Sequence, residues 1–177
     1  HGMLTTFNGD GSFSYTPDAN FNGADSFTYQ IVKSGLVSNV ATVSISVIPV
    51  NDAPTAVADT GATTEDAVLN LAAPGVLNND TDPDATDVLT VTAFDAASVK
   101  GATVTVNANG SFSYTPMANF NGDDSFTYHA TDGRSDSAVV TVSMHVNYVN
   151  DPPVPAGQSL TTAEDTAVAL TLSAHDV

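Results

Sequence analysis

Residues 8–29 read NGDGSFSYTPDANFNGADSFTY, and residues 107–128 read NANGSFSYTPMANFNGDDSFTY. The two stretches differ at only four positions, and their offset is 99 residues, from Phe13 to Phe112. The same offset relates Asn51-Asp52-Ala53-Pro54 to Asn150-Asp151-Pro152-Pro153, and Glu65-Asp66 to Glu164-Asp165. Three matches at one offset indicate an internal repeat. The sequence therefore predicts a tandem array whose unit is 99 residues long, about the size of one small domain.

The repeat predicts the boundaries of the units. If each unit begins at its Asn-Asp-x-Pro segment, residues 3–50 are the C-terminal part of a first unit. Residues 51–149 are then a complete unit, and residues 150–177 are the N-terminal part of a third. Prolines gather at both joints, where they stiffen an extended linker and stop strands from continuing: Pro49, Pro54, Pro152, Pro153 and Pro155.

Hydrophobic residues alternate with polar ones along several stretches of the unit. Residues 41–47 and their copies, residues 140–146, alternate apolar and polar side chains, which is typical of a half-buried antiparallel strand. Shorter stretches predict three more inward faces: Phe126, Tyr128 and Ala130; Val104 and Val106; Leu89, Val91 and Ala93. Asn-Gly pairs punctuate the strands as tight turns, and no window has helical spacing. We predict a sandwich of about seven strands.

The composition narrows the function classes. Three basic residues stand against 20 acidic ones, for a net charge of −17, which repels nucleic acid and anionic membranes and attracts cations. Hydrophobic residues make up 42% of the chain and alternate with polar ones, which favours a folded chain over an acidic disordered one. Without cysteine, the fold uses neither disulfides nor thiolate metal sites. No apolar run approaches the roughly 20 residues of a membrane span.

The motif at residues 115–128, TPMANFNGDDSFTY, is followed by Thr131-Asp132-Gly133 and by an alternating strand that ends in Val149-Asn150-Asp151-Pro152. This order resembles the bacterial cadherin-like and Ig-like repeats of large secreted adhesins, including repeats-in-toxin adhesins and VCBS-type repeats. The resemblance implies an all-β fold of Greek-key β-sandwich modules in tandem. It also implies stiffening by Ca²⁺ and a location outside the cell, at a bacterial surface.

Calcium prefers six to eight oxygen ligands, and the acidic residues gather where a cadherin-like module has its joints. With cadherin-like strand order, one set lies at the first joint: Asn51, Asp52, Asp82, Asp84 and Asp132. A second set belongs to the second joint: Glu65, Asn150, Asp151 and, as a further candidate, Asp176. The alternative is that these side chains only form turns, which we favour for Asp59, Asp87, Asp95 and Asp136.

The linkers depart from the cadherin pattern. A cadherin linker begins with an aspartate, but that position is occupied by Pro49 in the first linker and by Tyr148 in the second. The Asp-x-Glu motif of the cadherin module body is also missing. We therefore expect one or two ions at each joint rather than three.

The chain is predicted not to be an enzyme. No carboxylate pair lies in an apolar context, and no serine has an elbow motif or a basic partner. The leading hypothesis is a Ca²⁺-stiffened extender of a secreted adhesin that projects adhesive domains. Two alternatives stay open: direct binding, homophilic or to polysaccharide, and a spacer in a secreted polysaccharide-degrading enzyme.

The expected partners are the neighbouring repeats. Because residues 3–50 leave sheet edges open, residues 150–177 of a neighbour could be donated to them in self-association. About 20 residues, corresponding to 79–99, would still be missing from the completed unit.

Overall fold

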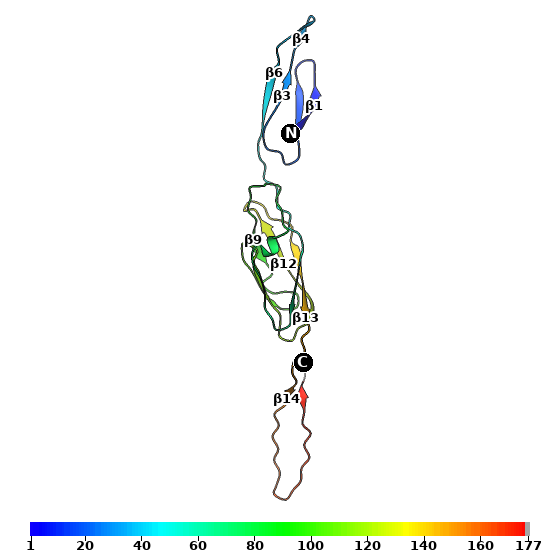
Figure 1. Ribbon diagram of the computed structural model, residues 1–177, viewed down its shortest axis with the longest axis vertical. Coiled ribbons are helices and arrows are strands. Elements are labelled where there is room, and N and C mark those ends of the chain that lie inside the picture. Colours follow the sequence, from blue (N-terminus) through cyan, green and yellow to red (C-terminus); the bar gives the residue numbers. More distant parts are fainter. Residues whose placement is uncertain (176–177) are drawn as a thin grey trace.

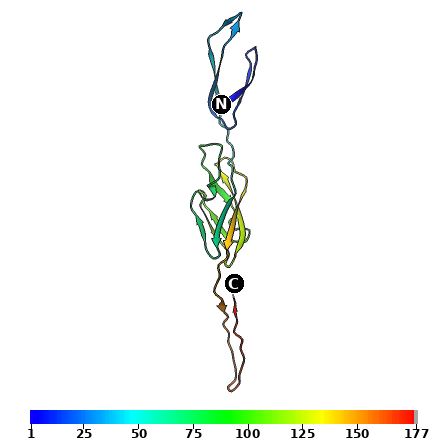
Figure 2. The same ribbon diagram turned by 45° about the vertical axis from the view of Figure 1, so that its right-hand side comes forward.

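The computed structural model describes residues 1–175, which form three segments in a line (Figures 1 and 2). We name them the first segment (residues 1–50), the central segment (51–149) and the tail (150–175). The first joint lies between the first segment and the central segment, and the second joint between the central segment and the tail. Among the described residues, no helix has the length and apolarity needed to cross a bilayer.

The central segment is a sandwich of two sheets. One sheet has the strand order β10-β11-β8 and the other β7-β13-β12-β9, seven strands in all, so the predicted all-β sandwich fold is confirmed. A single 3-10 turn, Gly75–Leu77, is its only helical element among the described residues. The strands are β7 (Asp59–Thr64), β8 (Leu69–Leu71), β9 (Thr90–Phe94), β10 (Thr103–Val106), β11 (Phe112–Thr115), β12 (Gly122–Thr131) and β13 (Val140–Asn147).

The core lies between these sheets and follows the period-two pattern of the sequence. Tyr114, Phe126, Tyr128 and Met144 are at most 2% exposed, and the polar residues between them face outward. Strand β9 departs from the prediction, because Val91 is buried whereas Ala93 is exposed. A register shift opposite His129 and Ala130 breaks the alternation, so that Phe94 packs against the core instead.

Strands β7 and β13, the first and last of the central segment, pair in parallel from Asp59↔Val142 to Thr64↔Asn147. The chain therefore enters the segment at one end and leaves it at the other. This arrangement puts residues 51–54 at the first joint and residues 148–151 at the second (Figure 1).

The first segment repeats part of this sandwich. Its strands are β1 (Gly2–Phe7), β2 (Phe13–Pro17), β3 (Gly23–Tyr29), β4 (Val32–Lys33), β5 (Leu36–Val37) and β6 (Ala41–Val47). They form three separate pairs, β1-β2, β3-β6 and β4-β5. Phe13 is 41% exposed, whereas its copy Phe112 is 5% exposed. The aromatic residues of the first segment therefore lie on open faces rather than in a closed core.

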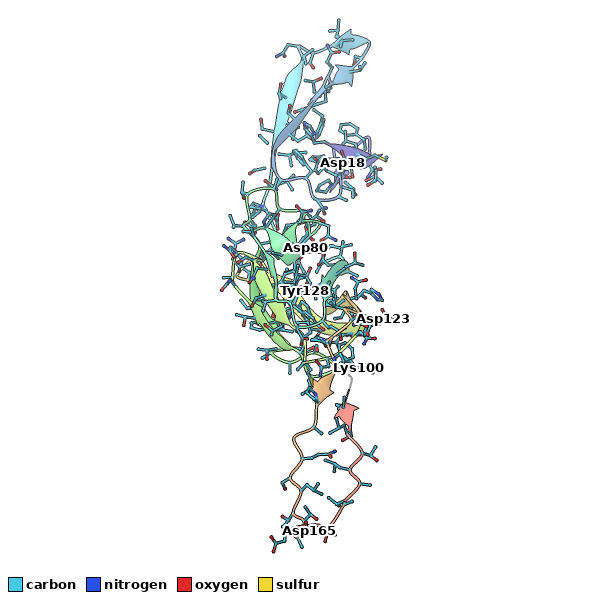
Figure 3. All side chains as sticks on the ribbon, turned by 60° about the horizontal axis from the view of Figure 1, so that its bottom comes forward. Asp18, Asp80, Lys100, Asp123, Tyr128 and Asp165 are labelled. Atoms are coloured by element: carbon cyan, nitrogen blue, oxygen red, sulfur yellow. The ribbon has the colours of Figure 1, made fainter. Side chains whose placement is uncertain are left out.

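The tail is a long hairpin closed near its base by strands β14 (Val154–Pro155) and β15 (Ala174–His175). Its apolar side chains are exposed, among them Leu160, Val168 and Leu170 at 47–48%. Asp165 lies at the far turn of this hairpin (Figure 3).

Backbone geometry repeats at the 99-residue offset. Positive φ angles occur in matching pairs, at Asn20 and Asn119 (60° and 57°) and at Asp66 and Asp165 (59° and 58°). Left-handed conformations in non-glycine residues are uncommon, so their recurrence reflects the same local turn in each copy.

Gly110 is required by close packing as well as by its φ of 80°. A Cβ at this position would overlap the carbonyl oxygen of Pro74, and Gly75 faces Gly110 equally closely. Gly110→Ala should therefore destabilise the central segment by at least ~2 kcal/mol in urea unfolding, through both backbone strain and overpacking. Gly122→Ala is the control, since Gly122 has a φ of 115° but open space around it. Equal losses would mean that the contact with Pro74 has no effect.

Candidate cation site at the first joint

Three loops of the central segment meet at the first joint. Asn51 comes from the entry linker, and its side-chain amide donates to Asp132 Oδ2 at 2.8 Å and to Ser135 Oγ at 3.1 Å. Asp132 stands in the turn that follows β12, 81 residues along the chain. The cadherin-like strand order thus brings Asn51 and Asp132 together, as the sequence analysis expected.

Asp84 joins the second loop to the linker. Its Oδ2 accepts from the backbone N–H of Asp52 at 2.9 Å, and its own N–H donates to Asp82 Oδ1 at 2.8 Å. Asp52, Asp82 and Asp84 are each partly buried. The five residues predicted for the first joint therefore lie at one end of the central segment and are linked by hydrogen bonds.

Two carboxylate oxygens at this end are buried without a hydrogen-bond partner, Asp82 Oδ2 and Asp87 Oδ2. Asp87 was predicted to be only a turn former, but Arg134 Nη1 lies 3.6 Å from its Oδ2 and donates to Asn51 Oδ1 at 2.9 Å. A buried carboxylate oxygen without a donor is costly unless a positive charge lies nearby. Arg134 supplies that charge beside Asp87, so among the described residues Asp82 Oδ2 is the oxygen that a further cation would neutralise.

The charge state of Asp132 supports the same conclusion. The backbone N–H groups of Ser135 and Arg134 donate to its Oδ1 at 2.7 Å and 2.6 Å. These bonds, with the side-chain donation from Asn51, lower the pKa of Asp132. Asp132 is therefore a carboxylate throughout the neutral range.

The first joint also contains a hollow of about 320 Å³ between the two segments. The central segment contributes Asp52 and Asp84 to it, and the first segment contributes polar side chains, among them Asp18 and Asn20, together with apolar ones such as Ile48. Figure 3 shows Asp18 on the first segment and Asp80 in the central segment. Oxygen-bearing side chains thus reach the joint from both sides.

The residues predicted for the second joint do not form one cluster. Glu65 is 5% exposed, its N–H donates to Asn147 O at 3.0 Å, and its Oε1 accepts from the N–H of Val149. Asn150 instead donates to Asp151 O at 3.0 Å. Asp176 lies outside the described residues. Glu65 thus holds the exit linker against the sandwich.

Asp59 was also predicted to be a turn former, but it lies beside a buried tyrosine. The hydroxyl of Tyr128 donates to Val76 O at 2.7 Å and lies 3.0 Å from Asp80 and 3.2 Å from Asp59 (Figure 3 labels Tyr128 and Asp80). Burial raises the pKa of both aspartates. This cluster lies behind the first joint and ties β7 to β12.

The donors at the first joint are oxygens of carboxylate, amide and hydroxyl groups, which hard cations such as Ca²⁺ prefer. As they stand, no three His, Cys, Asp or Glu side chains within residues 1–175 converge closely enough to hold a metal ion. The chemistry of the donors fits calcium, whereas their present spacing does not close a site. Sequence reasoning missed Asp87, Arg134 and Asp18, because only the folded loops bring them to the joint.

A seven-stranded, two-sheet sandwich with acidic loops at its joint defines the class of Ig-like and cadherin-like β-sandwich modules. Residues 51–147 match the bacterial cadherin-like domain, and residues 1–46 match a bacterial Ig domain. The cadherin-like match covers more than half of the chain, so the chain belongs to the bacterial cadherin-like domain family. Both matches are to families of non-catalytic modules.

One solved structure supports this fold. The two-domain EC1-2 fragment of human mucin-like protocadherin is 18% identical, with a TM-score of 0.56, over 82% of this chain and 81% of that one. Endo-fucoidan hydrolase MfFcnA4, from glycoside hydrolase family 107, is 21% identical, with a TM-score of 0.36, over 84% of this chain. The match spans 22% of that hydrolase. A comparison with curated proteins finds no match.

Proposed function

We propose that the chain is a calcium-stiffened extender from a secreted bacterial surface protein, and that it separates other domains without catalysing a reaction. The observation that carries this proposal is the first joint itself. Oxygen donors from three loops meet there, the buried Asp82 Oδ2 has no hydrogen-bond partner among the described residues, and a hollow lined by Asp52 and Asp84 adjoins the first segment. The three segments in a line (Figure 1) are the architecture that an extender needs.

In this proposal Asp52, Asp82, Asp84 and Asp132 would hold Ca²⁺ at the first joint, with Asn51 as a carbonyl ligand and Asp87 close by. Bound calcium would supply positive charge beside Asp82 Oδ2 and would replace that of Arg134 beside Asp87 Oδ2. Because the ligands come from the linker and from both loops, an ion that binds them restricts the linker, and its binding free energy stabilises that arrangement. Residues 3–50 and 150–177 are, in the same proposal, parts of two further repeats.

At the second joint we propose a weaker site around Asn150 and Asp151. Glu65 already holds the backbone N–H of Val149, so one of its oxygens is used. Glu65 both holds the exit linker and carries a negative charge. Glu65→Gln separates these two roles, because an amide oxygen still accepts from the N–H of Val149 but carries no charge.

Removing calcium tests the proposal. With Ca²⁺ present, small-angle scattering should give a rigid, elongated particle, and the central segment should melt at a higher temperature than in EDTA. The rise should grow with calcium concentration, as it does for any ligand that binds the folded state alone. Magnesium at the same concentration is the control, because it demands a tighter octahedral geometry. Identical scattering and melting in calcium and in EDTA would refute the proposal.

Arg134 should compete with the ion. Its guanidinium donates to Asn51 Oδ1 and lies next to Asp87, so calcium binding has to displace it. Arg134→Gln should therefore raise the calcium affinity about two- to fivefold, the range for an ion pair with one solvent-exposed partner. Isothermal titration measures this change. Lys100→Gln is the control, since it removes the same charge from a residue that lines a different hollow. Weaker binding of the Arg134 variant would mean that the guanidinium supports the site.

A further inference from the structure

Two of the four Asn-Gly pairs in the chain stand at the exit end of a repeat. Asn22 directly precedes β3, which begins at Gly23, and it lies beside the first joint. Asn121 directly precedes β12, which begins at Gly122. Both asparagines are exposed, and within residues 1–175 neither side chain makes a hydrogen bond. Both glycines have a positive φ, 114° and 115°, with open space where a Cβ would stand.

An asparagine that precedes glycine can react with its own backbone. Glycine has no Cβ to shield its nitrogen, so this nitrogen can attack Cγ of the asparagine and form a new N–C bond. The side-chain nitrogen leaves as ammonia and takes up the amide proton of the glycine, and a five-membered succinimide ring remains. Water opens the ring at either carbonyl, which gives aspartate or isoaspartate. The reaction consumes only water and adds one negative charge at neutral pH.

A third pair, Asn109-Gly110, is protected within the sandwich. Asn109 Oδ1 accepts from the N–H of Ser111 at 3.1 Å and from its hydroxyl at 2.8 Å. The N–H of Gly110 donates to Asn107 O at 2.9 Å, and Gly110 is buried against Pro74. Both groups that would have to react are therefore held in place. The fold thus separates reactive pairs from a protected pair of the same sequence.

The surroundings of Asn22 give its reaction a consequence. Asn22 lines the hollow of about 320 Å³ at the first joint, together with Asp52 and Asp84 of the central segment. Asp84 Oδ2 accepts from the N–H of Asp52, so this hollow adjoins both the linker and the second loop. A carboxylate at position 22 would therefore stand in the same hollow as two of the residues proposed to hold calcium.

We propose that Asn22 is a site of spontaneous deamidation, and that its product supplies the first joint with a calcium ligand from the first segment. The ligands named under the proposed function all belong to the central segment. An ion that also binds position 22 joins the two segments directly rather than through the linker alone. The effect on calcium rests on the proposed function, whereas the deamidation itself does not.

The new charge should act in opposite directions with and without calcium. Ligand charge sets the affinity of calcium sites, so a carboxylate at position 22 strengthens binding. Without a cation, the same carboxylate repels those of Asp52 and Asp84 across the joint. The deamidated chain should therefore be more flexible than the fresh chain in EDTA and stiffer in calcium.

Ageing the wild-type chain in EDTA at mildly alkaline pH tests the reaction independently of calcium. Peptide mapping by mass spectrometry should show the mass gain of amide-to-acid conversion at Asn22 and Asn121. Asn109 should react at least about tenfold more slowly, because a protected group reacts only when the structure opens locally. The control is the chain unfolded in guanidinium chloride, in which all three should react at similar rates. Equal rates in the folded chain, or no gain at Asn22, would overturn the proposal.

Asn22→Asp introduces one of the two products directly. Titration calorimetry should show calcium affinity raised about three- to tenfold, the effect of one charge a few ångströms from a divalent ion in a wet site. Asn39→Asp is the matched control, because it adds the same charge before β6, at the opposite end of the first segment from the joint. Equal affinities in the two variants would exclude position 22 as a ligand and overturn the proposal. Failure of the wild type and both variants to bind calcium would instead refute the proposed function, and the ligand role of position 22 with it.

Discussion

Asp84→Asn is expected to lower the calcium affinity of the chain by about tenfold or more, because ligand charge sets the affinity of calcium sites. Asparagine has the same shape as aspartate, and its amide oxygen can still accept from the N–H of Asp52, as Asp84 Oδ2 does at 2.9 Å. The loop should therefore keep its conformation and lose one negative charge next to the unpartnered oxygen of Asp82. In EDTA the variant should unfold within about 0.5 kcal/mol of the wild type.

Asp136→Asn is the matched control for this loss of charge. Asp136 is exposed and lies four residues after Asp132, but its side chain makes no hydrogen bond with the cluster among the described residues. Calorimetric titration of the two variants separates the two explanations. If both lose affinity equally, calcium responds to the net charge of −17 rather than to a built site.

Phe126→Ala is expected to destabilise the central segment by about 3–5 kcal/mol, the usual loss when a buried phenylalanine is truncated. Phe126 is 1% exposed, and its ring packs against Phe112 with the ring centroids 5.6 Å apart. Truncation leaves a cavity between two sheets whose backbones are fixed by their ladders, so the space does not close. Urea unfolding followed by far-UV circular dichroism measures the change in free energy.

The same substitution in the other copy is the control. Phe27 stacks edge to face on Phe13, with the ring centroids 5.1 Å apart, but it lies beside an open hollow. In dilute solution Phe27→Ala should leave the unfolding of the central segment unchanged, because that sandwich does not include Phe27. A comparable loss from both substitutions would mean that the two segments unfold as one unit.

Much of the fold could be predicted from the sequence, because alternation and the 99-residue repeat reflect the geometry of strands directly. Residues 41–47 and 140–146 became β6 and β13 almost to the residue. The exposure of Ala93 could not be predicted, since it depends on a register shift opposite β12 that no local pattern encodes. Likewise residues 8–29 and 107–128 are nearly identical in sequence but differ in burial, because the burial of these strands depends on strands from elsewhere in the chain.

The candidate site was less predictable for a related reason. Asn51 and Asp132 could be associated only through an assumed strand order, and the structure does bring them within 2.8 Å. From the sequence, Asp87 was interpreted as a turn residue. Its ion pair with Arg134 depends on side-chain conformations that the sequence does not give. Glu65 shows the limit most clearly, since the backbone group that it binds belongs to a linker 84 residues away.

The parallel pairing of β7 with β13 also determines how the molecule responds to tension. A force between its two ends pulls β7 from the start of its ladder and β13 from the end, so the two strands are sheared past each other. Six residue pairs, from Asp59↔Val142 to Thr64↔Asn147, then resist together rather than opening one after another. Resistance to forced unfolding depends on the height of the unfolding barrier rather than on equilibrium stability. Shortening this ladder should therefore lower the force at which the central segment unfolds.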